Sequence, residues 1–183
     1  MFSTPEYVVS SVAAMAEHAN AFARTVLGGE IIGLVGELGA GKTEFARAFV
    51  QTFAPGMEVT SPSFTIENIY DVRNQTFSAI NHLDLYRLPV NSTFPQLDDY
   101  LCNGDCLTLV EWPDRIRNAE DLLSWKVWIA SFGKPGATTR CVRYELINPQ
   151  HGVNDGVISA ASGSRSGEER IRGLQEQIGR QVR

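Results

Sequence analysis

The residues best suited to chemistry form one short run, Gly36-Glu37-Leu38-Gly39-Ala40-Gly41-Lys42-Thr43. Its pattern is G-x-x-x-x-G-K-[ST], in which backbone N–H groups bind phosphate oxygens, the lysine reaches the β- and γ-phosphates, and the hydroxyl group binds Mg²⁺. A helix starting near the lysine would also direct the positive end of its dipole at the phosphates. The pattern therefore predicts that ATP with Mg²⁺ is bound by a P-loop made of Glu37, Leu38, Gly39, Ala40, Gly41, Lys42 and Thr43.

A P-loop also requires an acidic residue near the metal ion, usually where a neighbouring buried strand ends. Asp84 and Glu111 compete for this role. The run 107–110 before Glu111 is the more strictly apolar of the two approaches, which favours Glu111. A single acid at a strand end is more often a solvated cap, but the P-loop makes both residues candidates for catalysis and for Mg²⁺ binding.

Two further features could complete the site. The run Thr60-Ser61-Pro62-Ser63-Phe64 lies where a loop that senses the γ-phosphate is expected, with the Thr60 hydroxyl group on Mg²⁺ or on the attacking water. A Ser/Thr-Pro turn that opens a strand explains the same residues equally well. Trp112, next to Glu111, either covers the nucleotide or joins the core. We therefore treat Thr60 as a catalytic candidate and Trp112 as a nucleotide-binding candidate.

Apolar periodicity predicts the elements that hold these residues. A helix is expected from residue 10 or 11 to residue 27, a buried strand over 31–35, and a second helix over 42–53 that ends at Ala54-Pro55-Gly56. Residues 64–72 and 77–85 alternate between apolar and mostly polar side chains, which predicts a β-hairpin with its turn at 73–75. The order strand, glycine loop, helix is the one that a P-loop needs.

The second half of the chain predicts more strands. A short helix is expected between Phe94 and Leu101, then a buried strand over 106–110 that ends at Glu111. Two more strands, 126–132 and 140–147, are joined by a glycine- and proline-rich turn. Together these elements predict an α/β fold: one P-loop NTPase-like domain of three layers, whose central sheet is parallel around the P-loop and antiparallel at its margin.

Beyond Pro149 the composition changes to glycine, serine and charged residues, which predicts an ATPase domain over 1–149 and a flexible tail over 150–183. Within the tail, Ile171, Leu174, Ile178 and Val182 fall on one face of a helix. Such an amphipathic helix could dock on the domain or on a partner. A solvated, frayed helix is the alternative, and base rates for chain termini favour it.

Composition indicates which partners and which cellular compartment are compatible with the chain. The net charge of −5 argues against direct DNA binding, because gripping a nucleic-acid backbone needs a basic face. Three cysteines without a C-x-x-C pair indicate a reducing compartment. The start of the chain lacks the features of a secretion signal, and no apolar run approaches membrane-spanning length. A cytoplasmic protein without membrane contact is therefore expected.

In its motifs the chain resembles the TsaE family, also called YjeE. The resemblance rests on the P-loop, on Thr60-Ser61-Pro62-Ser63-Phe64, on His82-Leu83-Asp84-Leu85-Tyr86-Arg87-Leu88 and on Val110-Glu111-Trp112-Pro113. These motifs occur in the family's order and cover about residues 7–147, and four motifs in sequence are far more specific than a P-loop alone.

The resemblance implies a weak ATPase that acts with a TsaB and TsaD complex, which transfers threonylcarbamoyl to adenosine 37 of ANN-decoding tRNAs. By that likeness Lys42 holds phosphate, Thr43 and Glu111 serve Mg²⁺ directly or through water, and Asp84 supports the metal or the attacking water. Thr60 belongs to the sensing loop, and nucleotide contacts fall near Ser10 or Ser11. The tRNA reaches the chain only through the partner complex.

The chain departs from the family pattern in three ways: the first helix is about a turn longer, Glu37 replaces the usual aspartate, and the tail has no clear counterpart. Two other P-loop functions require features that this sequence lacks. A small-molecule kinase should carry an arginine-rich lid, and a GTPase should carry Asn-Lys-x-Asp and Asp-x-x-Gly motifs; neither feature is present in the sequence. A nucleotide-gated interaction module, in which turnover is incidental, remains a non-enzymatic alternative.

Overall fold

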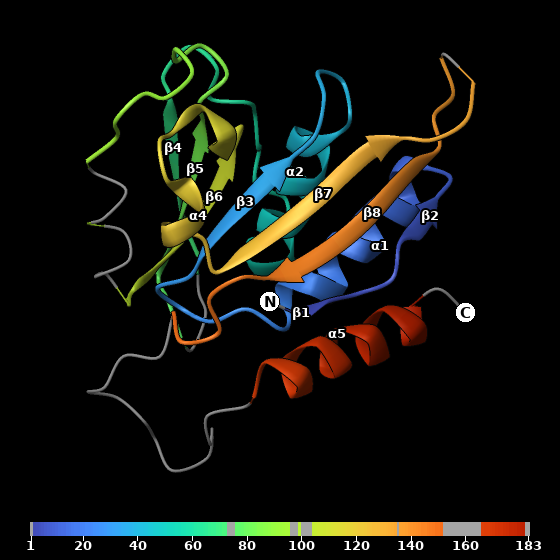
Figure 1. Ribbon diagram of the computed structural model, residues 1–183. Helices are drawn as coiled ribbons and strands as arrows, with labels where there is room; N and C mark the ends of the chain where they lie inside the picture. The colour runs from blue at the N-terminus through green and yellow to red at the C-terminus, as the bar shows by residue number, and fades with distance from the viewer. Residues whose placement is uncertain are drawn as a thin grey trace.

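A computed structural model describes residues 2–72, 76–95, 99, 104–134, 136–151 and 166–181. Its centre is one sheet of order β1-β8-β7-β3-β6-β5-β4, with β2 also paired to β8 (Figure 1). The strands are β1 (Phe2–Ser3), β2 (Tyr7–Val9), β3 (Ile31–Val35), β4 (Glu67–Asp71), β5 (Ala79–Asp84), β6 (Cys106–Glu111), β7 (Trp125–Ser131) and β8 (Arg140–Leu146). The helices are α1 (Val12–Ala23), α2 (Lys42–Phe53), α4 (Ala119–Leu122) and α5 (Gly167–Gln181), with a 3₁₀ turn, η1 (Pro113–Arg115).

The middle of the sheet is parallel and its margins are antiparallel, as the sequence predicts. The strands β7, β3, β6 and β5 run parallel, whereas β4 and β8 are antiparallel to their neighbours. In the register, Glu111 pairs with Leu34 on one side and with Asp84 on the other. Because parallel strands end at the same edge of a sheet, both acids lie beside the loop that leaves β3.

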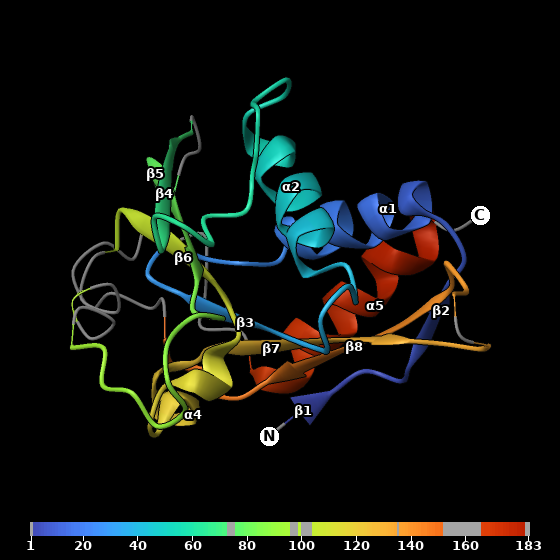
Figure 2. The same cartoon turned by 90° about the horizontal axis from the view of Figure 1, so that it is seen from above.

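Helices cover one face of the sheet, and a shorter segment covers the other (Figure 2). Under α1 and α2 the core holds the fully buried side chains of Phe22, Phe45, Phe49, Trp125 and Tyr144. On the opposite face a smaller apolar cluster is covered by η1 and α4; its buried members are Ile31, Leu83, Leu85, Val110, Ile116, Ala119 and Leu123. The three-layer α/β fold class expected from the sequence is therefore confirmed.

The first helix is shorter than expected. It begins after Ser11, whose hydroxyl oxygen accepts a hydrogen bond from the backbone N–H of Ala14 at 3.0 Å. It ends at Ala23 rather than at residue 27, because the amide and the hydroxyl group of Thr25 both donate to the carbonyl of Phe22. The predicted end was therefore wrong by about one turn.

The hairpin, the buried strands and the second helix occur where the patterns placed them. The strands β4 and β5 pair antiparallel, but β4 begins at Glu67 rather than near Phe64, since the amides of Thr65 and Ile66 both turn back to the carbonyl of Pro62. The hairpin turn at 73–75 and most of the short helix expected between Phe94 and Leu101 lie outside the described residues.

Residues 167–181 of the tail form α5, which packs against the domain beside α1. Ile171, Leu174 and Ile178 are buried in the main core, and Arg170 forms an ion pair with Glu30 at 2.6 Å. The alternative of a solvated, frayed helix is therefore wrong for these residues. Val182 and residues 152–165 lie outside the described part of the chain. Across the described residues, no helix combines the length and the apolar character needed to cross a membrane.

Candidate functional site

The loop between β3 and α2 depends on its glycines. A Cβ atom at Gly36 would lie 2.1 Å from the carbonyl oxygen of Ile129, so no side chain fits there. Gly39 and Gly41 have φ angles of +77° and +106°, a region that residues with a Cβ atom rarely adopt. Gly41 is the N-cap of α2, and the first amides of a helix have no acceptor within it. The loop therefore presents backbone N–H groups and a helix dipole to an anion.

Lys42 lies inside this loop. Its Nζ donates to the carbonyls of Gly36 and Glu37, at 2.8 and 2.9 Å, and lies 3.8 Å from the centroid of the Trp112 ring. Burial lowers the pKa of Lys42 below its ordinary value, and the nearby carboxylates of Glu111 and Asp84 partly offset that effect. The ammonium group is thus desolvated and held by neutral groups, which a phosphate oxygen can replace.

Glu111 connects the P-loop helix to β5. Its Oε1 accepts a hydrogen bond from Oγ1 of Thr43 at 2.8 Å and lies 3.0 Å from Nε2 of His82. Glu111 and His82 are only 3% and 0% exposed, so the carboxylate has a single orientation set by its two neighbours. His82 lies two residues before Asp84 on β5, which is the same face of that strand.

Asp84 is held by the loop that precedes β4. Its Oδ2 accepts hydrogen bonds from the hydroxyl groups of Ser61 and Ser63, and its Oδ1 accepts one from the backbone N–H of Tyr86. Burial raises the pKa of Asp84, but these three hydrogen bonds together with the nearby His82 outweigh burial, so the pKa lies below its ordinary value. Asp84 is therefore ionised at neutral pH.

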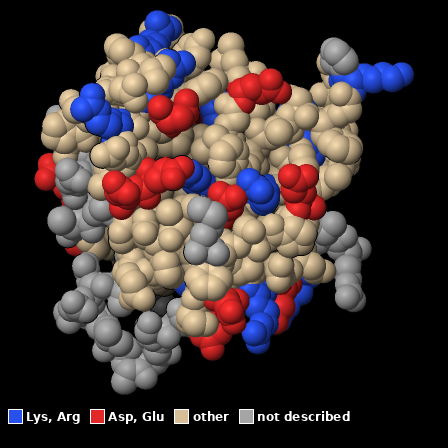
Figure 3. All heavy atoms as spheres, in the orientation of Figure 1, with Lys and Arg blue, Asp and Glu red and all other residues tan. Residues whose placement is uncertain are grey.

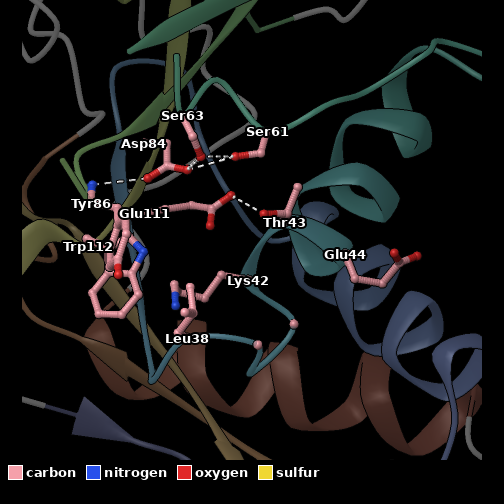
Figure 4. A pocket seen from close by; sticks show the side chains of 12 residues that line it. Leu38, Lys42, Thr43, Glu44, Ser61, Ser63, Asp84, Tyr86, Glu111 and Trp112 are labelled. Carbon is pink, nitrogen blue, oxygen red and sulfur yellow. Dashed lines mark hydrogen bonds between the residues drawn. The ribbon is translucent and has the colours of Figure 1, made fainter. Parts of the chain in front are cut away.

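These groups converge on one cavity of about 300 Å³ (Figure 4). It is lined by Leu38, Gly39, Gly41, Lys42, Thr43, Glu44, Ser61, Ser63, Asp84, Tyr86, Glu111 and Trp112. In the close view the side chains of Asp84, Glu111 and Lys42 lie one below another, with Trp112 on one side of them and Thr43 on the other, whereas Glu44 points away. Most of the predicted site residues are thus brought together.

Some predicted site residues lie elsewhere. Thr60 is exposed and outside the lining; its carbonyl accepts hydrogen bonds from Asn68 and from the Tyr70 hydroxyl group, while Ser61 and Ser63 supply the hydroxyl groups that reach the site. Ser10 and Ser11 are also outside the lining, and Ser11 caps α1. Glu37 and Ala40 belong to the loop through their backbone and are likewise not among the lining residues.

Sequence reasoning missed Ser61, Ser63 and Tyr86 as members of the site. Ser61 and Ser63 alternate around Pro62, and this spacing could have signalled two hydroxyl groups on one side of an extended loop. Tyr86 contributes its backbone N–H to Asp84 and packs its ring 5.0 Å from that of Trp112. Because any residue other than proline can donate a backbone N–H, the identity of residue 86 does not reveal this contact.

The donor atoms fit Mg²⁺ better than a softer metal. Carboxylate and hydroxyl oxygens are its preferred ligands, and proteins typically supply one or two carboxylates while phosphate and water complete the octahedron. Thr43 and Glu111 already touch through oxygen atoms, with Asp84 on the adjacent strand. Among the residues that the structure describes, no group of three or more His, Cys, Asp or Glu side chains forms a metal-binding cluster by itself. The site therefore suits a metal ion that arrives with a phosphate.

A family model described as "Threonylcarbamoyl adenosine biosynthesis protein TsaE" matches residues 9–135. The chain belongs to the TsaE family. The match contains every residue predicted for the site, from Ser10 to Trp112, and it ends before β8 and α5. Membership thus accounts for the P-loop, for both acids and for the strands that carry them.

Curated TsaE proteins resemble part of the chain. The tRNA threonylcarbamoyladenosine biosynthesis protein TsaE of Bacillus subtilis is 37% identical over 54% of this chain and 58% of its own length. The protein of the same name from Haemophilus influenzae is 37% identical over 45% of this chain and 51% of its own length. The chain therefore matches a little over half the length of these TsaE relatives.

The fold as a whole resembles a solved structure, the crystal structure of YdiB from Bacillus subtilis, with a TM-score of 0.65 and 21% sequence identity. The superposition covers 100% of this chain and 99% of that one. At this identity the likeness concerns the fold alone. It includes elements that lie before and after the family match at residues 9–135.

Proposed function

We propose that this TsaE-family chain binds ATP with Mg²⁺ at the P-loop, hydrolyses it slowly, and thereby supports threonylcarbamoylation of tRNA adenosine 37 in the cytoplasm. The observation that carries the proposal is the convergence of Lys42, Thr43, Asp84 and Glu111 on one cavity at the carboxyl ends of β3, β5 and β6. The four residues meet different requirements of phosphoryl transfer. Lys42 is a cation for phosphate, Thr43 is a hydroxyl ligand for Mg²⁺, and the carboxylates of Glu111 and Asp84 serve Mg²⁺ and water.

The contacts suggest a role for each side chain. Lys42 exchanges its two carbonyl acceptors for phosphate oxygens and neutralises their charge. Thr43 and Glu111 hold Mg²⁺ directly or through water, and His82 keeps Glu111 in place. When bound, Mg²⁺ would neutralise negative charge on the phosphates. Asp84, ionised and fixed by Ser61 and Ser63, orients water next to the γ-phosphate.

Slow turnover without a partner follows from the lining of the cavity. No arginine is among its lining residues in the described chain, so Lys42 is the one cationic side chain of that lining, assisted by the P-loop amides and by Mg²⁺. An arginine supplied by another protein raises the rate of P-loop hydrolases by about 10³-fold or more. We propose that homologues of TsaB and TsaD form the partner complex and carry out the transfer.

Contact with tRNA is proposed to be indirect. The net charge of −5 opposes binding of a phosphate backbone. On the face seen in Figure 3, acidic and basic side chains are interspersed rather than gathered into a basic surface. The partner complex would therefore hold the tRNA, while this chain supplies the step driven by ATP.

Nucleotide titration and hydrolysis assays test the proposal. Fluorescent ATP should bind in the presence of Mg²⁺, with ATP competing better than GTP, and Lys42→Ala should weaken binding by about 100-fold because a charge-assisted contact is lost. ATP hydrolysis should be slow for the chain alone and faster after addition of the TsaB and TsaD complex. Equal rates with and without that complex would count against partner coupling.

The absence of arginine from the described lining also favours the second candidate, a nucleotide-gated interaction module. Glu111→Gln separates the two, because it keeps an oxygen acceptor for Thr43 but removes the charge that Mg²⁺ requires. If tRNA modification continued over many cycles with this variant while hydrolysis had stopped, the module would be the better description. If modification stopped together with hydrolysis at ATP concentrations that saturate the variant, turnover would be required.

A further inference from the structure

A guanidinium group reaches the back of the P-loop from the opposite margin of the sheet. Arg140, the first residue of β8, donates from Nε to the carbonyl oxygen of Ala40 at 2.9 Å and from Nη2 to that of Gly39 at 3.2 Å. Its Nη1 donates to the carbonyls of Ala137 and Thr139, at 2.8 and 3.0 Å. The fork of one side chain thus joins the end of the β7–β8 connection to two consecutive peptide units of the P-loop.

We propose that Arg140 is a positioning residue for the nucleotide: it holds the carbonyls of Gly39 and Ala40 away from the cavity, so that the adjoining amide faces the phosphate. In a planar trans peptide the C=O and the following N–H point in opposite directions. Holding the Ala40 carbonyl therefore aims the N–H of Gly41, which is the N-cap of α2. This inference rests on the proposed binding of ATP.

The P-loop needs such a restraint because of its own residues. Gly39 and Gly41 have positive φ angles, and glycine reaches many other backbone conformations at little cost. The amide of Ala40 is already bound, since it donates to the carbonyl of Glu37 at 3.1 Å. The peptide between Ala40 and Gly41 lacks that anchor, and its carbonyl is the one that Arg140 holds at the shorter distance. Arg140 therefore restrains the Ala40–Gly41 peptide, whose N–H is the group that would bind an anion.

The charge of Arg140 acts in the same direction. Within the described residues its guanidinium forms no ion pair and is balanced by four carbonyl dipoles instead. A positive charge without a carboxylate partner, next to a loop that presents N–H groups, raises the potential that an anion meets there. Lysine would keep the charge but not the planar set of donors that four carbonyls require. Residue 140 also lies beyond the family match at 9–135, so no motif marks it.

Three variants of the full chain test this role. Arg140→Lys keeps the charge, Arg140→Ala removes the side chain, and Arg143→Lys is the matched control, because Arg143 lies on the same strand and pairs with Glu145 instead of the P-loop. Two hydrogen bonds to the loop are lost in Arg140→Lys, so the dissociation constant for ADP and for ATP should rise about 10-fold. Arg143→Lys should bind as the wild type does.

Further measurements separate positioning from a general structural role. The apparent KM for ATP should rise in Arg140→Lys by more than kcat falls, because ground-state binding is affected first. Added guanidinium chloride, compared with sodium chloride at the same ionic strength, should restore nucleotide binding to Arg140→Ala. At equal saturation with ADP, and at a temperature where melting curves show both proteins to be folded, the amide of Gly41 should be less protected from hydrogen exchange in Arg140→Lys than in the wild type.

The outcomes distinguish this inference from the proposed function. If the wild type binds ATP, Lys42→Ala binds it about 100-fold more weakly, and Arg140→Lys binds as tightly as Arg143→Lys, the role of Arg140 is overturned while ATP binding stands. If the wild type itself fails to bind ATP, the proposed function fails first. Should Arg140→Ala not fold, Arg140→Lys together with exchange at Gly41 in the ADP complex decides the question, and equal protection of that amide in Arg140→Lys and in the wild type would overturn the role.

Discussion

Two places in the molecule bury carboxylates against the same sheet, and their partners differ in charge. At the start of β3, Glu30 is fully buried beneath α5 and accepts hydrogen bonds from Arg170, from the Trp125 indole N–H and from the amide of Leu27. Burial raises the pKa of Glu30, and the Arg170 guanidinium opposes that effect. The negative charge of Glu30 is therefore neutralised within the chain by Arg170, and we call these two residues the closed pair.

At the other end of the strands, Asp84 and Glu111 are 5% and 3% exposed, but hydroxyl groups, a backbone amide and an imidazole hold them. In the part of the chain that is described, no lysine or arginine forms an ion pair with either acid. The negative charge of Asp84 and Glu111 can therefore be neutralised by a bound cation, and we call these two acids the open site. Burial alone does not mark a binding carboxylate; the charge of its partner does.

The largest expected effect comes from breaking the closed pair. Arg170→Met leaves Glu30 buried without its cation and should lower the free energy of unfolding by about 3–5 kcal/mol. Urea denaturation measures this change. Arg172→Met, on the exposed face of the same helix, is the control and should change little. Adding Glu30→Gln to Arg170→Met should recover much of the loss, and an equal loss in Arg172→Met would show that the pair is unimportant.

Removing charge from the open site should affect binding rather than folding. Glu111→Gln should lower Mg²⁺-dependent affinity for ATP by about 100-fold, equivalent to about 2.7 kcal/mol, while the free energy of unfolding changes by less than about 1 kcal/mol. Titration calorimetry with and without Mg²⁺ measures the first quantity and urea denaturation the second. Asp114→Asn removes an exposed carboxylate near the same pocket and should leave both values close to those of the wild type.

The hydroxyl groups around Asp84 should matter less than the acids themselves. Ser61→Ala combined with Ser63→Ala removes two donors to Oδ2 and should reduce ATP hydrolysis by about 10-fold, the lower range for partners of a metal-site ligand. Steady-state hydrolysis at saturating ATP checks this expectation. Thr65→Ala, in the same loop but not bonded to Asp84, is the matched control. Equal rates for the two variants would remove Ser61 and Ser63 from the site.

The smallest expected effect is a pH dependence of stability. The pKa of Asp84 is lower in the folded protein than in the unfolded chain, so the unfolded chain binds a proton first on acidification. The stability from Asp84 is present above its unfolded pKa of about 3.9 and is lost as pH falls through the folded value. The difference in unfolding free energy between wild type and Asp84→Asn, measured without Mg²⁺, should therefore shrink below about pH 4. A difference independent of pH would contradict these hydrogen bonds.

Much of the site could be predicted from sequence because its parts are local. The P-loop, the strand before it and the helix after it are consecutive residues whose spacing carries the chemistry, and β3 and α2 have the predicted bounds. The strand that ends at Glu111 was equally clear, since a short apolar run marks a strand buried on both faces. The resemblance to TsaE rested on the same motifs and is confirmed by the family match.

The remainder depends on contacts between residues far apart in the chain. The sequence points to the Thr60 hydroxyl group, but Ser61 and Ser63 are the residues that reach Asp84. The directions of side chains in a loop depend on its hydrogen bonds, here those that Asn68 and Tyr70 make to the Thr60 carbonyl. The docking of α5 depends on Arg170 meeting Glu30, 140 positions away. Helical periodicity finds the apolar face of α5 but cannot say what covers it.

The groups available for phosphate chemistry can be named from the sequence, because backbone conformation at Gly39 and Gly41 and the reach of Lys42 and Thr43 are properties of neighbouring residues. The folded chain is needed to see that Glu111 is the acid in contact with Thr43, that Asp84 pairs with Glu111 in the register, and that Arg140 binds the loop from behind. Strand order and packing bring these residues together, and neither is encoded in the spacing of any one segment.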